Sequence, residues 1–108
     1  MNDLFEKGAI LTMAEMIEYS PGGVISKQVL KNVAGNITLF SFDKGQGLSE
    51  HTAPFDAVVE ILDGAAEISI DSKPLNITVG QTIIMPANIP HALYATERFK
   101  MLLTMIRG

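Results

Sequence analysis

Residues 45–64 read GQGLSEHTAPFDAVVEILDG, and this stretch decides how the rest of the chain is interpreted. It places His51 between a glycine-rich turn and an apolar run. The only other histidine is His91, which lies in GQTIIMPANIPHALYA (80–95) after a segment bracketed by prolines. Because the two histidines occur in matching settings, with strand-like sequence between them, we expect them to lie on two sides of one pocket.

Composition limits the class of protein. The chain has 108 residues, of which 47% are hydrophobic and 19% are charged, as is usual for one globular domain with a single core. The net charge is −4, and the sequence has no basic run. Nucleic acids and anionic membrane surfaces attract basic proteins, so both are excluded as expected partners. A small molecule or another protein remains.

The absence of cysteine excludes disulfides, thiolate metal sites and a cysteine nucleophile. The N-terminal residues include acids where a signal peptide needs a basic start, and no apolar run approaches the roughly 18 residues of a membrane span. The sequence therefore predicts a cytoplasmic protein without a membrane partner.

Turn-forming residues divide the chain after residue 23 into short runs. Several runs alternate apolar and polar residues, as in Ala65–Ile70 and Leu75–Val79. About eight short strands, with no long helical pattern between them, predict an all-β fold, either an antiparallel sandwich or a barrel. Residues 1–23 form an N-terminal extension whose apolar spacing fits a short helix and a short strand equally well.

The motifs around the two histidines resemble those of the cupin superfamily. The family's first motif, G-x5-H-x-H-x3/4-E-x6-G, matches at Gly45, His51 and Gly64, and its second, G-x5-P-x-G-x2-H-x3-N, matches at Gly80, Pro86 and His91. The resemblance covers roughly residues 35–106. It implies a small single-domain cupin of the cupin_2 kind, in which residues 24–108 form one antiparallel jelly-roll barrel, or double-stranded β-helix.

The chain departs from the family at residues that bind metal. In the family, two histidines and a glutamate of the first motif join the histidine of the second to hold a divalent ion. Here Ala53 replaces the second histidine and Ala57 replaces the glutamate. The resemblance therefore implies only His51 and His91 as metal ligands, so zinc, nickel, manganese or iron is expected to bind weakly or not at all.

A third metal ligand would have to come from a nearby carboxylate. Positions 51, 53 and 57 share one strand parity and are expected to face the barrel interior, whereas Asp56 and Glu60 have the other parity. Pro54 can break that alternation, which makes Asp56 the best substitute and leaves Glu60 or Glu50 as weaker ones. The alternative for Asp56 is a turn residue that accepts a backbone hydrogen bond.

The two alanines also open the expected barrel mouth. We expect a cavity in which His51, His91 and Tyr94 are the polar groups and Met85 and Met101 belong to the apolar wall, as is typical of small-molecule sites. The alternative for the methionines is ordinary core packing.

Three functions are compatible with this sequence. The first is binding of a small organic ligand in the barrel. The second is a metal-dependent enzyme acting on a small oxygen-rich molecule through the two histidines. The third is an assembly module. No nucleophile–base pair, phosphate loop or pair of carboxylates is visible, so the sequence leaves open whether the chain is an enzyme.

Two segments, Ile37–Phe42 and Phe99–Ile106, are apolar on both strand faces. Such strands are covered on both sides, either as central strands or at a subunit interface. Together with the extension, they lead us to expect a homodimer in which Ile10 and Met13 pack on the partner.

Overall fold

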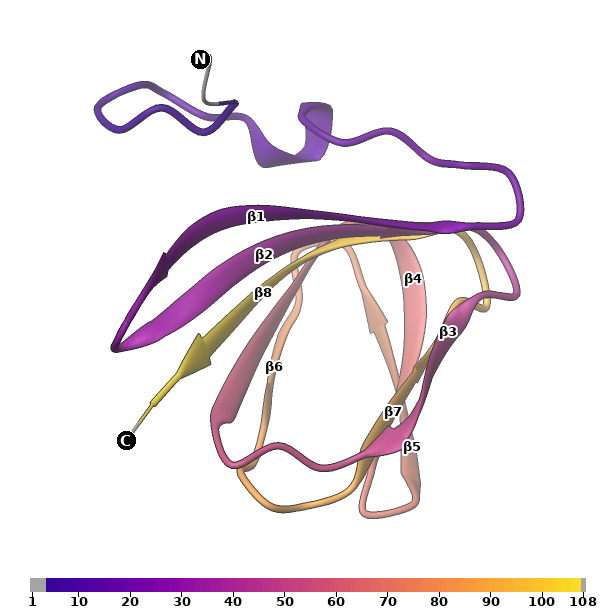
Figure 1. Ribbon diagram of the computed structural model, residues 1–108. Helices are drawn as coiled ribbons and strands as arrows, with labels where there is room; N and C mark the ends of the chain where they lie inside the picture. The colour runs from indigo at the N-terminus through magenta and orange to yellow at the C-terminus, as the bar shows by residue number, and fades with distance from the viewer. Residues whose placement is uncertain (1–3, 108) are drawn as a thin grey trace.

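The structure is a computed structural model that describes residues 4–107; residues 1–3 of the expected extension and Gly108 lie outside the described residues. Eight antiparallel strands curl into a barrel that is open at one end (Figure 1), which confirms the expected all-β jelly roll. Within residues 4–107 the strands are β1 (Val24–Asn32), β2 (Gly35–Phe42), β3 (Gly47–His51), β4 (Asp56–Ile70), β5 (Lys73–Thr78), β6 (Thr82–Met85), β7 (His91–Tyr94) and β8 (Phe99–Ile106).

The long strand β4 closes the barrel because it belongs to both of its sheets. Its first half pairs with β6 and β8, and its second half pairs with β5 and β7. Gly64 lies at the changeover with a φ of 75°, and a Cβ there would collide with the carbonyl oxygen of Arg98. Only glycine fits such a bend. The last glycine of the first motif is thus the site of a bend within one strand.

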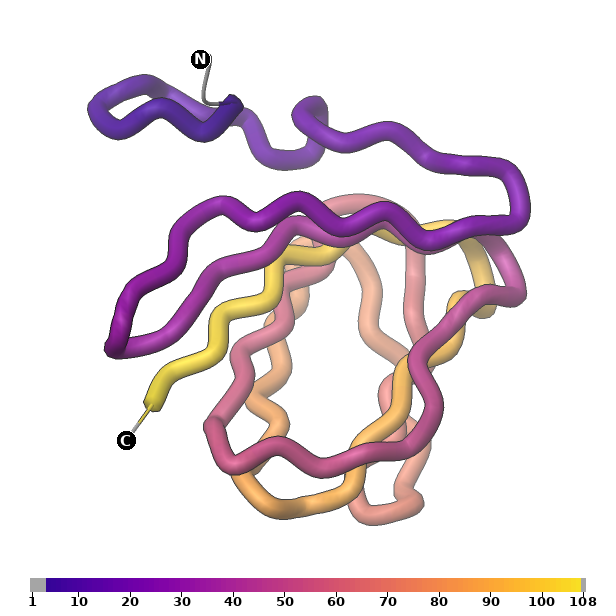
Figure 2. The backbone as a smooth tube through the Cα atoms, in the orientation of Figure 1, coloured from indigo at the N-terminus to yellow at the C-terminus, as the bar shows by residue number. Residues whose placement is uncertain are grey.

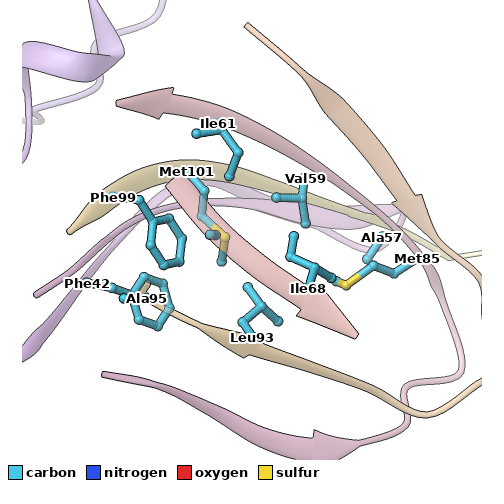
Figure 3. Close-up of a cluster of buried hydrophobic side chains, with 11 residues drawn as sticks. Phe42, Ala57, Val59, Ile61, Ile68, Met85, Leu93, Ala95, Phe99 and Met101 are labelled. Carbon is cyan, nitrogen blue, oxygen red and sulfur yellow. The ribbon is translucent and has the colours of Figure 1, made fainter. Parts of the chain in front are cut away.

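The core fills the space between the two sheets (Figure 3). Alternate residues of β4, among them Ala57, Val59 and Ile61, point inward and are buried. The rings of Phe42 and Phe99 stack at 4.5 Å between centroids. Burying this apolar surface is the main source of stability in a chain without disulfides.

The two strands that are apolar on both faces are central ones. The sheet order is β1-β2-β8-β4-β7-β3, so β2 lies between β1 and β8, and β8 lies between β2 and β4. Their outer face is partly covered by residues 14–19, here called the strap, which follow the N-terminal segment over β1, β2 and β8 (Figures 1 and 2). Ile17 of the strap is only 2% exposed.

Hydrogen bonds from three strands hold the strap. Lys27 Nζ of β1 donates to the carbonyl oxygen of Met16, Ser41 Oγ of β2 to that of Glu18, and Lys100 Nζ of β8 to that of Ala14. Lysine side chains serve here as donors to a backbone that forms no sheet of its own. Within residues 4–23 the regular structure of the extension is one 3-10 helix, η1 (Met13–Glu15), which is shorter than the helix that its spacing allows.

The part of the chain that the structure describes contains no helix long and apolar enough to cross a membrane.

Candidate functional site

The two histidines meet across a pair of antiparallel strands. His51 ends β3, His91 begins β7, and the two residues are register partners. Their Nε2 atoms are 3.1 Å apart, and the rings lie edge to face with centroids 4.3 Å apart. His91 is buried, at 4% exposed, whereas His51 is exposed. The pair therefore runs from the interior to the solvent.

Both imidazoles are oriented in the same way. His51 Nδ1 lies 2.7 Å from the carbonyl oxygen of Ser49, and His91 Nδ1 lies 3.3 Å from that of Ile89. In each case the carbonyl belongs to the residue two positions earlier. Both Nε2 atoms are consequently directed at each other.

The loop before β7 is fixed against the loop before β4. Asn88 has a φ of 64°, a left-handed conformation that asparagine tolerates, and its N–H donates to the carbonyl oxygen of Ala53 at 2.7 Å. Asp56 Oδ1 accepts the N–H of Ala87 at 2.9 Å. Of the two roles that the sequence allows Asp56, its carboxylate performs the structural one, so the structure does not bring it to the histidine pair.

A cavity of about 210 Å³ lies next to the pair between the two sheets. Two of its eleven lining side chains are the histidines, and the other nine are apolar. The apolar ones are Phe40, Leu48, Ala53, Ala57, Met85, Leu93, Met101, Leu103 and Met105. Figure 3 shows Met85 beside Ala57 at the edge of the core and Met101 deeper within it. The site is thus an apolar chamber with a polar side made by two imidazoles.

The two alanines face this chamber, as strand parity predicts. Ala57 is the register partner of both Met85 and Met105, so thioethers flank the position where the family's glutamate would lie. Met85 and Met101, which the sequence identifies as candidate lining residues, also belong to the buried core cluster. These methionines therefore both line the chamber and pack in the core, which are the two roles that the sequence allows them.

Tyr94 does not line the chamber. His91 and Leu93 point inward from β7, so Tyr94, the next residue along the strand, points outward and is 49% exposed. Sequence reasoning missed Leu103, although it shares the parity of Met101 on β8 and could have been found by alternation.

Burial is the main cause of a lowered pKa at His91, and the neighbouring charge of His51 lowers that pKa further, whereas the contact with Ile89 raises it. Both main causes disfavour the imidazolium form. The buried ring is therefore neutral near pH 7, and its lone pair is available inside the chamber.

The donor set does not fit a tightly held divalent ion. Within residues 4–107, no three side chains of histidine, cysteine, aspartate or glutamate gather where they could hold one metal ion. The two Nε2 atoms converge, but the rest of the chamber wall is carbon and thioether. Catalytic sites for such ions generally use at least three nitrogen, oxygen or thiolate ligands.

A larger groove of about 700 Å³ separates residues 4–7 from β1, and residues 27–31 line its other side. It contains no histidine, and Lys27, its most enclosed cation, already donates to the strap. We therefore place the candidate site in the chamber.

Comparison with known proteins gives a family and no activity. Residues 38–106 match the family model described as a cupin domain. The search of functionally curated proteins found no match.

Several solved structures resemble nearly all of this chain. A conserved protein of unknown function from Streptococcus pyogenes has 40% sequence identity and a TM-score of 0.92, over 98% of this chain and 93% of that one. A cupin superfamily protein from Desulfitobacterium hafniense has 28% identity and a TM-score of 0.91, over 98% and 97%. A cupin 2 conserved barrel domain protein from Leptotrichia buccalis has 41% identity and a TM-score of 0.87, over 90% of this chain and 47% of its own.

Proposed function

We propose that this chain, which belongs to the cupin family, binds a small organic molecule in the chamber of its barrel, with His51 and His91 as its polar contacts. The observation that carries the proposal is the makeup of the chamber, in which nine apolar side chains surround two converging imidazoles. Small-molecule sites commonly combine an apolar wall with a few convergent polar groups.

The chamber has room for such a ligand. An apolar protein cavity of about 150 Å³ accommodates benzene, and dry cavities of this kind bind apolar guests. The chamber volume of about 210 Å³ leaves space for a ring with a short substituent. Met85, Met101 and Met105 can adjust to the guest because the methionine side chain is unbranched and flexible.

Divalent metal ions have a minor role in this proposal. Zinc, nickel, manganese or iron is expected to bind weakly or not at all, since two imidazoles leave most of the coordination shell to water. A metal-dependent enzyme acting on a small oxygen-rich molecule is the second candidate. It is favoured by one observation, the convergence of the two Nε2 atoms at 3.1 Å.

Methyl NMR tests the binding function directly. With ¹³C-labelled methionine methyl groups, addition of a small ring compound such as anisole is expected to shift the resonances of Met85, Met101 and Met105. Met13 and Met16, which lie outside the chamber, are internal controls. No shift with anisole or with phenol, or equal shifts at all five positions, would refute the proposal.

A pair of matched variants tests whether the guest binds in the chamber. Ala57→Leu adds bulk to a chamber wall and is expected to abolish the shifts, whereas Ala92→Leu adds the same bulk on the outward side of β7 and leaves them intact. Binding that survives Ala57→Leu would place the guest elsewhere.

We also propose that the chain forms a homodimer through the outer face of the β2–β8–β4–β6 sheet and the N-terminal extension. One register row across this face contains Leu30, Ile37, Thr104, Val58 and Ile84, with no charged residue. Ile84 is 60% exposed and Ile10 is 99% exposed, which is unfavourable unless a second surface covers them.

Light scattering tests the assembly. The wild type is expected to give a dimer mass at micromolar concentration, and Ile84→Lys a monomer mass. A monomeric wild type would contradict the proposed assembly.

A further inference from the structure

With both rings neutral, the histidine pair has one hydrogen too few for its contacts. Three contacts require an N–H: His51 Nδ1 to the Ser49 carbonyl, His91 Nδ1 to the Ile89 carbonyl, and the contact between the two Nε2 atoms. Two neutral imidazoles carry only two N–H groups between them. Carbonyl oxygens only accept, so the two Nδ1 contacts use both hydrogens. Two Nε2 lone pairs are then left facing each other at 3.1 Å.

A third hydrogen can come from an added proton or from a bound molecule. An added proton would place a charge on a ring that faces nine apolar side chains and no carboxylate. This is unfavourable at the buried His91 and leaves only the exposed His51 as a site for the proton. A bound molecule with an O–H group supplies the hydrogen without a net charge. The exposed His51 can then turn to water, while the buried Nε2 of His91 accepts from the molecule.

We propose that the ligand of this chamber is a small phenol, whose hydroxyl donates the missing hydrogen to His91 Nε2 and whose ring occupies the apolar wall. This inference rests on the proposed binding function and names its ligand class. Three thioethers and the ring of Phe40 line the chamber. Sulfur–aromatic contacts are favourable and are often made at the ring edge, which favours an aromatic body over an aliphatic one.

The same geometry disfavours carboxylates. A carboxylate accepts hydrogen bonds and donates none, so it would face two lone pairs. None of the residues that line the chamber is lysine or arginine, so a bound anion would have no cation to pair with. Burying an unpaired charge is costly.

Three compounds with the same ring separate the possibilities: phenol, its methyl ether anisole, and benzoate. Calorimetric titration of the full chain is expected to show phenol binding at least about tenfold tighter than anisole, because a site with a buried acceptor rejects the analogue that lacks the donor. Benzoate is expected to bind weakest. Tighter benzoate binding would overturn the phenol inference.

The outcomes distinguish this inference from the proposed function. If phenol and anisole bind with equal affinity and both shift the chamber methionines, the chamber binds organic molecules but the missing-hydrogen argument is wrong. If neither binds, both proposals fail. If nickel alone binds at one equivalent with submicromolar affinity, a cation fills the gap between the Nε2 atoms and the phenol inference is overturned.

Nitrogen NMR of the histidines distinguishes a hydrogen bond between phenol and His91 from a purely structural role of His91. With phenol bound, both rings are expected to carry their hydrogen on Nδ1, with unprotonated Nε2 atoms, and the Nε2 resonance of His91 is expected to shift. Ala92→Leu, on the outward face of β7, is the control variant and is expected to keep the shift. A His91 ring that carries its hydrogen on Nε2 in the phenol complex would overturn the inference.

Discussion

The strap and the chamber lie on opposite faces of the same sheet and differ in how completely their polar groups are hydrogen-bonded. In the strap, Tyr19 donates a hydrogen bond to Asp63, and the cations of Arg98 and Lys100 lie over the Tyr19 ring. The Tyr19 hydroxyl and the three strap carbonyls that accept from β1, β2 and β8 all have partners of matching chemistry. In the chamber, two imidazoles share three contacts with two hydrogens. A satisfied polar network stabilises a fold, and an incomplete one is available to a ligand.

The largest effect is expected from restoring the family's metal ligands in the chamber. Ala53→His with Ala57→Glu adds an imidazole and a carboxylate to the chamber wall beside His51 and His91. Divalent nickel, zinc or manganese is then expected to bind about a thousandfold tighter than to the wild type, since two more ligands replace water.

Calorimetry checks this gain, and either single variant is the control, with an intermediate affinity expected. A wild type that already takes up one equivalent at submicromolar affinity, and loses it on Asp56→Ala, would contradict the weak-metal interpretation and favour the enzyme hypothesis.

The second prediction concerns the packing of the strap. Ile17→Ala removes a side chain that is 2% exposed, so we expect it to lower the free energy of unfolding by about 2–4 kcal/mol. Phenol affinity is expected to remain unchanged because the strap lies outside the chamber. Chemical denaturation measures the loss, and the exposed Val33→Ala is the control. A parallel loss of affinity would show that the two faces are coupled.

The third prediction concerns the strap's hydrogen bond. Tyr19→Phe is expected to lower the free energy of unfolding by about 1–2 kcal/mol, as for a hydrogen bond to a charged group near the surface. Burial, followed by the contact with Asp63, raises the pKa of Tyr19, so its phenol is expected to ionise at higher pH than free tyrosine. Ultraviolet titration of the variant Tyr94→Phe, whose remaining tyrosine is Tyr19, measures this shift. Ionisation of Tyr19 at the pH of free tyrosine would contradict the strap contacts.

The smallest expected effect is the pH dependence that arises from His91. Its pKa is lowered in the folded state by burial and by His51, so the unfolded chain takes up a proton first as the pH falls. The stability is complete above about pH 6.5 and decreases as the pH falls from there to the lowered pKa of the folded state. Denaturation at several pH values measures this slope. The slope should weaken in His91→Gln, and stability that rises on acidification through this window would contradict the sign.

Alternation and turn residues were enough to predict an all-β sandwich or barrel, because inward and outward positions of a half-buried strand differ in chemistry along the chain. The resemblance of the two histidine motifs then favoured the barrel. The same rule placed Ala53 and Ala57 on the chamber wall. It did not reveal that β4 continues through Gly64, since the bend depends on the close approach of the Arg98 backbone from a distant strand.

The chamber's hydrogen count could not be obtained from the sequence. It depends on two backbone carbonyls, that of Ser49 in the irregular end of β3 and that of Ile89 in the loop before β7. The role of Asp56 likewise depends on the N–H of Ala87, which lies far along the chain. The sequence identifies the side chains, whereas the path of the backbone determines which groups those side chains contact.

A crystal structure of the chain with saturating phenol tests the central claim most directly. The account predicts one phenol in the chamber, with its ring against the methionines and its oxygen about 2.6–3.2 Å from His91 Nε2. An empty chamber under these conditions, or a ring whose hydroxyl points away from both histidines, would contradict it.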